Sequence, residues 1–334
     1  MNRQSKSTSE KIGWIPFWNL HPLKTELHNL GLRDLDMESG VPTEVNRLLA
    51  SGKVSVAPCS SVCLALNTDL NLALPLGVAC EDTVDSVYLG SRVESTQLHQ
   101  LIRERHRKAS QLLEDLLESG FDIRTKAQKF LEISNSELSA PEVLPAIRLS
   151  RASATSVMLC RVLYRLWFGQ NAYEAACRLG YISENPPVTD ERFTLDLVIG
   201  DEALARRGEF HKIYDLGSIW ADLTGLPFVY ACWQSSRKVP SSVSQILMKA
   251  AERAEAKMKV QPKAYLPDMP LLDDKGRVIN LEDYWSKIYY RLGLREYKSL
   301  TFFLSLVKTI HPIKNSEAIT VRILHFQEIV NSFR

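Results

Sequence analysis

Residues 42–58 read PTEVNRLLASGKVSVAP, and this stretch decides the fold class. Thr43 stands where a helix N-cap belongs, and apolar residues follow it at helical spacing. The pair Ser51-Gly52 then ends the helix, and residues 54–58 have the apolar, β-branched composition of a strand. A helix, a tight turn and a short strand therefore follow one another within 17 residues, which predicts an α/β chain.

The same alternation of short strands and helices continues on both sides of this stretch. Such an order is typical of a mostly parallel sheet flanked by helices. We expect residues 133–142 to be a polar surface insertion. Strands are predicted at residues 11–17, 72–78, 86–89, 145–149, 195–199 and 226–233, and helices at 22–30, 95–117, 157–168, 219–223 and most of 243–310.

Length and composition indicate a globular protein of two lobes. The chain has 334 residues, and one domain usually takes about 150. Hydrophobic residues make up 45% and charged residues 24%, and the net charge is +2. The basic run at residues 103–108 is interrupted by Glu104 and lies in a helical pattern, so we interpret it as a solvated helix face. We therefore expect no nucleic-acid partner.

The sequence offers no signal for export, for a membrane or for a cofactor. The polar residues 1–10 are not followed by the apolar stretch of a secretory signal, and no run approaches roughly 18 apolar residues. We expect a cytoplasmic protein without a membrane partner. Cys59 and Cys63 are four residues apart but no second ligand pair accompanies them, so no metal is expected. The lack of glycine-rich nucleotide loops disfavours nucleotide cofactors.

Two clusters of hydroxyl residues follow predicted strands. Ser153-Ala154-Thr155-Ser156 lies between a short apolar strand and a helix, where free backbone N–H groups and the helix dipole favour a carboxylate or phosphate. Helix capping is an equal alternative for Ser153 and Thr155. Ser60-Ser61 comes directly after the strand at 54–58, at the sheet edge where α/β proteins usually bind ligands, although an N-cap is the more common role for such serines.

Four further residues are candidates for chemistry. Asn19 ends the first predicted strand and offers a donor and an acceptor, although a turn residue is the commoner interpretation. His21 is close to it, but a lone histidine is more often structural. Ser86 lacks a nucleophile elbow and assignable triad partners. Gly200-Asp201 brings a carboxylate toward a cleft or simply ends a strand.

Several ordered segments of the chain together resemble one family, the chorismate dehydratases that open the futalosine route to menaquinone. The likeness extends to about residue 310, and its most specific part lies between residues 199 and 229. Residues 125–142, 262–280 and the tail 312–334 fall outside it. The matching segments are IGWIPFWNLHPL at 12–23, PCS at 58–60, TVDSV at 83–87, SATSV at 153–157, IGDEAL at 199–204 with its continuation through 214–229, and residues 284–303.

This resemblance implies a two-lobed fold like that of type II periplasmic binding proteins. In that fold the chain crosses twice between the lobes, here at residues 86–89 and 228–233. Lobe 1 is then expected to comprise residues 1–90 and 229–334, with a helical C-terminal part, and lobe 2 residues 91–228. The ligand cleft is expected between them.

The resemblance also implies a reaction and its residues. The family removes water from chorismate and gives 3-[(1-carboxyvinyl)oxy]benzoate, without metal or organic cofactor. The partner is thus a small dicarboxylate, and the catalytic residues are expected to be Asn19 and Ser86. The residues expected to bind substrate are Ser60, Ser153, Thr155, Ser156 and Asp201.

Three positions depart from the family pattern. Ala154 replaces an arginine, Ser55 an acidic residue and Cys63 a glutamate. These changes leave open a non-catalytic cytosolic protein that binds carboxylates on the same fold. A second alternative is the naphthoate synthase of the same pathway, but its Ser-Pro-Cys-Pro-Asn-Asp-like opening is not matched by residues 15–20.

Overall fold

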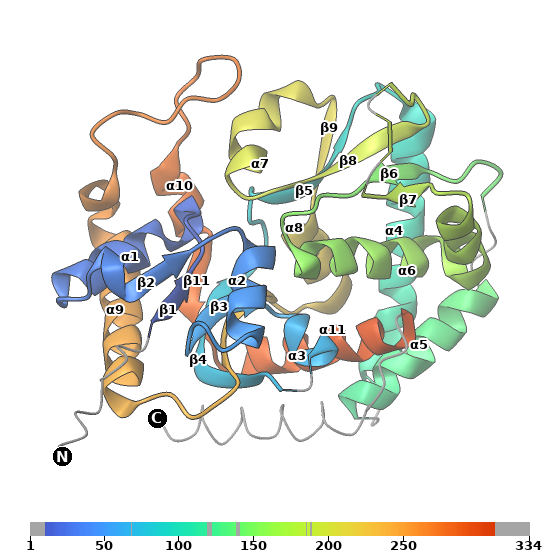
Figure 1. Ribbon diagram of the computed structural model, residues 1–334. Helices are drawn as coiled ribbons and strands as arrows, with labels where there is room; N and C mark the ends of the chain where they lie inside the picture. The colour runs from blue at the N-terminus through green and yellow to red at the C-terminus, as the bar shows by residue number, and fades with distance from the viewer. Residues whose placement is uncertain are drawn as a thin grey trace.

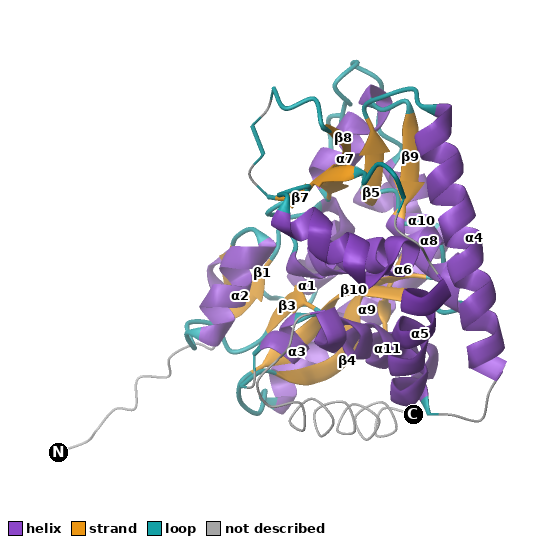
Figure 2. Cartoon of the chain, turned by 90° about the vertical axis from the view of Figure 1, so that its right-hand side faces the viewer, coloured by secondary structure: helices purple, strands orange, loops and turns teal. Residues whose placement is uncertain are grey.

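The computed structural model describes residues 11–67, 69–118, 122–137, 141–184, 186–187 and 189–310. They form two lobes, each built on its own sheet with helices packed against it, which confirms the predicted α/β class (Figure 1). Figure 2 shows β5, β8 and β9 at one end of the molecule and β3, β4 and β10 at the other. No helix within the described ranges is long and apolar enough to cross a membrane. The expected features of residues 1–10 and 312–334 lie outside the described residues.

Lobe 1 contains a four-stranded sheet in the order β11-β4-β10-β3, whose neighbours are all antiparallel. A parallel pair, β1 and β2, continues from β3 because Ile12 bridges Val56. The strands are β1 (Ile12–Trp14), β2 (Met37–Ser39), β3 (Ala57–Ser60), β4 (Asn71–Cys80), β10 (Phe228–Ser235) and β11 (Ile288–Arg291). The α-helices in these parts of the chain are α1 (His21–Asn29), α2 (Pro42–Ala50), α3 (Cys63–Leu66), α9 (Ser241–Val260) and α10 (Leu281–Ser286), with short 3-10 turns η1 (Trp18–Leu20), η2 (Asp34–Asp36) and η4 (Pro262–Tyr265).

Lobe 2 contains a five-stranded sheet in the order β7-β6-β8-β5-β9, in which the β6 pairs are parallel and the β5 pairs antiparallel. Its strands are β5 (Val87–Ser91), β6 (Ala146–Arg148), β7 (Ile182–Ser183), β8 (Phe193–Ile199) and β9 (Lys212–Asp215). Its helices are α4 (Thr96–Glu118), α5 (Ile123–Glu137), α6 (Ala154–Arg178), α7 (Asp201–Arg206) and α8 (Leu216–Thr224), with the 3-10 turn η3 (Arg207–Glu209).

The strand directions differ from the mostly parallel sheets that we predicted. Alternation of strands and helices specifies that strands exist, but the direction of each is set by where the chain returns to the sheet. Here the chain leaves lobe 1 after β4 and returns to it in β10, which lies beside β4, so the two strands run antiparallel. The expectation of parallel pairing is therefore wrong for the four strands β11-β4-β10-β3.

The chain passes between the sheets in the segment 81–86, and β5 already lies in lobe 2. The last helix, α11 (Leu294–Ile310), packs against α5 and α6 and so extends from lobe 1 under lobe 2 (Figure 1). Part of the predicted surface insertion, up to Glu137, is the end of α5, and residues 138–140 lie outside the described ranges. One hydrophobic core joins both lobes and includes the fully buried Trp14, Trp167, Trp220, Trp233 and Trp285.

Candidate ligand site between the lobes

A narrow cavity of about 50 Å³ lies where the lobes meet. Its walls come from the ends of β1, β3, β8 and β10, from the segment 81–86 and from the start of α6. Most of the lining is apolar. The polar residues among the lining are Asn19, Ser60, Ser86, Ser153, Ser156 and Tyr230, so five of the seven expected site residues meet here.

Ser86 is buried at the end of the crossing segment. The phenol of Tyr284 donates a hydrogen bond to its Oγ at 3.0 Å. The Ser86 carbonyl accepts from the backbone N–H of Gly200 at 2.6 Å. Burial raises the pKa of Tyr284, so this phenol stays protonated and keeps donating. Because Oγ already accepts this bond, the hydroxyl hydrogen of Ser86 is left to donate to a ligand.

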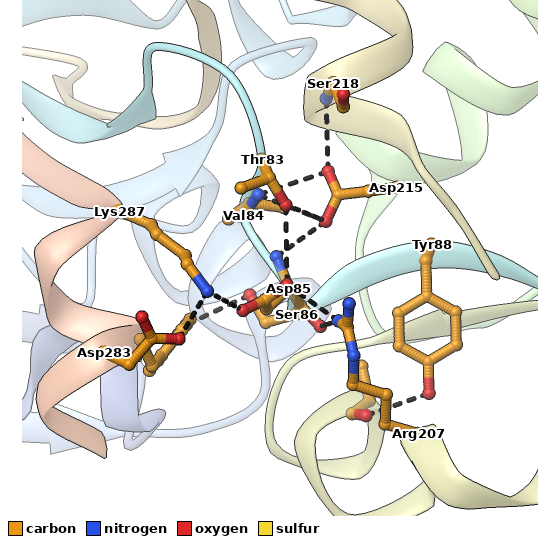
Figure 3. A network of polar contacts seen from close by, with 12 residues as sticks. Thr83, Val84, Asp85, Ser86, Tyr88, Arg207, Asp215, Ser218, Asp283 and Lys287 are labelled. Atoms are coloured by element: carbon orange, nitrogen blue, oxygen red, sulfur yellow. Dashed lines mark hydrogen bonds and ion pairs between the residues drawn. The ribbon is translucent and has the colours of Figure 1, made fainter. Parts of the chain in front are cut away.

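Asp215 holds the crossing segment against lobe 2 (Figure 3). Its carboxylate accepts from the Thr83 hydroxyl at 3.0 Å, from the Val84 N–H at 3.2 Å and from the Asp85 N–H at 2.7 Å. The same carboxylate caps α8 by accepting from its first N–H groups. Burial raises the pKa of Asp215, and the surrounding donors oppose this rise. One side chain thereby fixes both the position of the Ser86 segment and the start of α8.

Asp85, which precedes Ser86, ties the segment to both lobes. Among the described residues, Asp85 is the one non-glycine residue with a positive φ, which is +61°. Its carboxylate forms ion pairs with Lys287, which follows α10 of lobe 1, and with Arg207 of lobe 2 at 2.8 Å (Figure 3). A left-handed backbone costs free energy in a residue with a side chain, and these contacts offset that cost.

Asn19 approaches the cavity from η1. Its backbone carbonyl accepts from the Tyr290 phenol at 2.7 Å. Its side-chain oxygen, Oδ1, is buried and has no hydrogen-bond partner among the described residues. A buried oxygen without a partner destabilises a protein, so this atom is placed to accept a hydrogen bond from a ligand or a water.

The other serines line the opposite sides of the cavity. Ser60 ends β3, where its backbone carbonyl accepts from Gln234 Nε2 at 2.9 Å. Ser153 caps α6 by accepting from the N–H of Ser156 at 3.3 Å, and Ser156 Oγ lies 3.1 Å from Ser153 Oγ. Capping and ligand binding are thus compatible at Ser153, because its hydroxyl lines the cavity while it caps.

Thr155 and Asp201 do not line this cavity. Thr155 Oγ1 accepts from the Val62 N–H at 3.3 Å, and Asp201 Oδ1 accepts from the Trp18 N–H at 3.0 Å. Both bonds join lobe 2 to lobe 1. Burial raises the pKa of Asp201 to about 6, and the hydrogen bond from Trp18 opposes this rise. Direct contact of Thr155 or Asp201 with substrate stays a prediction.

His21 also lies outside the cavity lining. It begins α1 and its imidazole is nearly parallel to the Trp285 ring, at a centroid distance of 6.2 Å and an angle of 13°. Burial lowers its pKa. The structural role that the sequence favoured for this histidine is consistent with this packing.

No Lys, Arg or His of the described chain lines the cavity itself, but a neighbouring groove carries cations. This groove has a volume of about 480 Å³ and shares Ser153 with the cavity. Arg151 and Arg161 line it, together with Ala154. Arg151 is exposed and has no hydrogen-bond or ion-pair partner in the part of the chain that the structure describes.

A match over most of the described residues shows the family of this chain. The model of a menaquinone biosynthesis family matches residues 10–144 and 133–309. This chain belongs to that family. The menaquinone biosynthesis family match covers the Asn19, Ser86 and Ser153 segments together, and it supports a role in this pathway.

Solved structures confirm the fold of this family member. The periplasmic aliphatic sulphonate binding protein SsuA from Escherichia coli is 11% identical, with 94% of this chain and 91% of that chain covered and a TM-score of 0.50. Protein AF1704 from Archaeoglobus fulgidus is 13% identical over 98% of both chains, with a TM-score of 0.45. The expected two-lobed fold like that of periplasmic binding proteins is confirmed.

Four residues that shape the site were not predicted from the sequence. Asp215 and Asp85 hold the Ser86 segment, Tyr284 donates to Ser86, and Tyr230 lines the cavity. Each lies within or beside a segment that resembles the family, and that position is a signal for Tyr284 and Asp215. Their contacts could not be inferred, because they join residues more than a hundred positions apart.

Proposed function

We propose that this menaquinone biosynthesis family member is a chorismate dehydratase, which converts chorismate to 3-[(1-carboxyvinyl)oxy]benzoate and water. The observation that carries the proposal is the pairing of Ser86 and Asn19 on one cavity. Ser86 has a hydroxyl hydrogen left to donate, and Asn19 has a buried oxygen without a partner. Such a pair can orient a hydroxylated ring without any charged catalytic side chain.

The chemistry requires a carbon–oxygen bond to break and a neighbouring carbon–hydrogen bond to give up its proton. The ring hydroxyl leaves with the electrons of its bond, and the proton completes the water molecule. Aromatisation of the ring supplies the driving force. Ser86 is placed to donate a hydrogen bond to the departing oxygen and stabilise its developing charge, and Asn19 to hold the substrate in position.

The absence of an acid or base from the cavity lining agrees with this scheme. The lining residues include no Asp, Glu or His of the described chain. We propose that a carboxylate of the substrate itself accepts the ring proton. The enol ether places such a carboxylate close to the carbon that loses its hydrogen, so a bound and correctly folded substrate suffices.

Binding of a dianion still needs donors and positive charge. Ser153 and Ser156 provide hydroxyls at the start of α6, where the helix dipole favours an anion. We propose that Arg151, in the groove that shares Ser153, provides the cation that Ala154 does not. The cavity of about 50 Å³ is narrow, and we propose that the lobes move apart to admit chorismate and hold it in a wider cavity than this one.

The test is direct incubation of the purified chain with chorismate. The reaction removes the cyclohexadiene absorbance, and mass spectrometry identifies the product. We expect 3-[(1-carboxyvinyl)oxy]benzoate. Saturable binding of chorismate without turnover would instead favour the non-catalytic carboxylate binder. The absence of both binding and turnover would refute the proposal. Turnover of cyclic dehypoxanthinyl futalosine would identify the naphthoate synthase.

A further inference from the structure

A second cavity lies inside lobe 2 and shares no lining residue with the cavity between the lobes. Its volume is about 340 Å³. Helix α4 forms one wall, strand β9 and helix α8 form the others, and Trp167 of α6 contributes its ring. The residues lining it are Thr83, His99, Ile102, Arg103, His106, Trp167, Lys212, Ile213, Tyr214, Asp215, Ser218 and Ile219.

Two of the residues that line this cavity carry buried polar atoms without partners. Trp167 is buried, and its indole Nε1 has no hydrogen-bond partner among the residues described. Both ring nitrogens of His106 are also buried and without partners there. The two rings meet edge to face, with centroids 6.3 Å apart. An indole N–H can only donate, so Trp167 Nε1 can pair only with an acceptor.

The outer part of the cavity is positively charged. Arg103 and Lys212 line it, and neither has an ion-pair partner within the described ranges. Burial lowers the pKa of His99, and these two cations lower it further. Burial also lowers the pKa of His106. The imidazoles are therefore neutral near pH 7, each able to donate one hydrogen bond.

The acidic groups around the cavity do not cancel this charge by direct contact. Asp215 lines it, but its carboxylate is already engaged by the Thr83 hydroxyl and by four backbone N–H groups. Glu94 acts on His99 and Asp222 on His106 through space, and neither lines the cavity. Two cations and an indole donor thus remain for a ligand.

We propose that this cavity is a binding site for a small aromatic carboxylate. The apolar surfaces of Ile102, Ile219 and the Trp167 ring fit a flat apolar body. Arg103 and Lys212 at the rim pair with its carboxylate. The site does not overlap the cavity between the lobes, because the two share no lining residue, so its test does not depend on the proposed reaction.

Calorimetric titration of the full chain with sodium benzoate tests this site, at constant ionic strength maintained with sodium chloride. We expect saturable binding of benzoate. We also expect benzoate to perturb the His99 and His106 ring signals in the NMR spectrum, which would locate the binding site in this cavity. The double variant Arg103→Gln/Lys212→Gln is expected to bind benzoate about tenfold more weakly or worse. The matched control Arg107→Gln, exposed on the same helix, should bind as the wild type does.

The same titration with inorganic phosphate shows whether the site recognises the aromatic body of the ligand or only its negative charge. We expect phosphate to bind more weakly than benzoate, because it lacks a flat apolar body. The proposal is overturned by the absence of saturable benzoate binding, by unchanged histidine signals, by equal affinity in the double variant, or by phosphate binding as tightly as benzoate. Circular dichroism of each variant confirms that the exposed substitutions leave the fold intact.

Discussion

The hydrogen bond from Tyr284 fixes what the Ser86 hydroxyl can do. A serine that accepts from a permanently protonated phenol has its own hydrogen available for the cavity. Asn19 complements it with an acceptor oxygen. The two residues lie on η1 and on the crossing segment, so their joint action depends on that segment being held in place by Asp85 and Asp215.

Removal of either side chain should abolish most of the turnover. We expect Ser86→Ala and Asn19→Ala each to lower kcat about a hundredfold or more, because each removes a group that the proposed mechanism places against the reacting ring. The measurement is the loss of chorismate absorbance, with a folded state verified by thermal unfolding. Ser244→Ala on α9 is the control and should retain the wild-type rate. Wild-type rates in both site variants would show that the chemistry lies elsewhere.

Asp201 should make stability depend on pH in a specific direction. Its pKa is raised by burial to about 6, from 3.8 in the unfolded chain. The folded state therefore holds its proton more tightly, so stability falls as the pH rises from about 4 to 6, by up to about 3 kcal/mol. Asp201→Asn keeps an acceptor for Trp18 and removes the charge.

The variant Asp201→Asn should accordingly be more stable than the wild type at pH 8, with most of the difference disappearing at pH 4. Urea unfolding at both pH values measures this. An equal difference at both pH values would show that the carboxyl does not titrate with the raised pKa. Asp190→Asn is the control with the opposite sign, because an arginine lowers the pKa of this partly buried carboxyl.

At the scale of elements, the junction between β8 and α7 depends on a glycine. Gly200 has φ +68°, and a Cβ there would lie 3.0 Å from Phe17. Its N–H also donates to the carbonyl of Ser86. The junction therefore sets both the turn into α7 and the distance between the lobes at the cavity.

Substitution of this glycine should affect stability and turnover together. We expect Gly200→Ala to lower the free energy of unfolding by about 1–3 kcal/mol and to lower kcat/KM. Gly180→Ala is the matched control, because Gly180 has φ +70° and nothing within 4 Å of an added Cβ. The control should lose stability from the backbone alone and keep full activity. Equal loss of activity in both variants would contradict the role of the Phe17 contact.

The region of α2 and β3 shows that a local sequence pattern does not fix where a strand begins. The helix at α2 and the following strand were predicted from residues 42–58, although the strand begins at Ala57 rather than at 54. Residues 54–56 instead form backbone hydrogen bonds with the segment that contains β1, through the Val56 carbonyl and the Ser55 N–H. Composition identified the extended segment, but its partner strand determined where the ladder begins.

At the scale of the whole molecule, two hydrogen bonds beside the cavity join the lobes in addition to the shared hydrophobic core and the ion pairs of Asp85. Thr155 accepts from Val62, and Asp201 accepts from Trp18. The cavity is narrow with these bonds formed, so we expect substrate entry to break them. They are placed to stabilise the closed form, in which the donors of both lobes reach the same ligand.

Weakening one of these bonds should shift the protein toward the open form. We expect Thr155→Val to raise KM several-fold with a smaller change in kcat, because closure around substrate becomes less favourable. Small-angle X-ray scattering should show a larger radius of gyration in the variant without ligand. Thr301→Val, a buried threonine bonded within its own helix, is the control. An unchanged KM and radius in Thr155→Val would refute this role.

The sequence predicted the α/β class from its periodicity and two lobes from its length. The fold like that of periplasmic binding proteins, and the segments expected at its cleft, were predicted from the resemblance of ordered motifs to a family. Only the folded chain shows that β4 and β10 run antiparallel, that Thr155 and Asp201 bind the other lobe, and that Tyr284 donates to Ser86. Distance along the chain explains this, since Tyr284 and Ser86 are 198 residues apart and no local pattern encodes their contact.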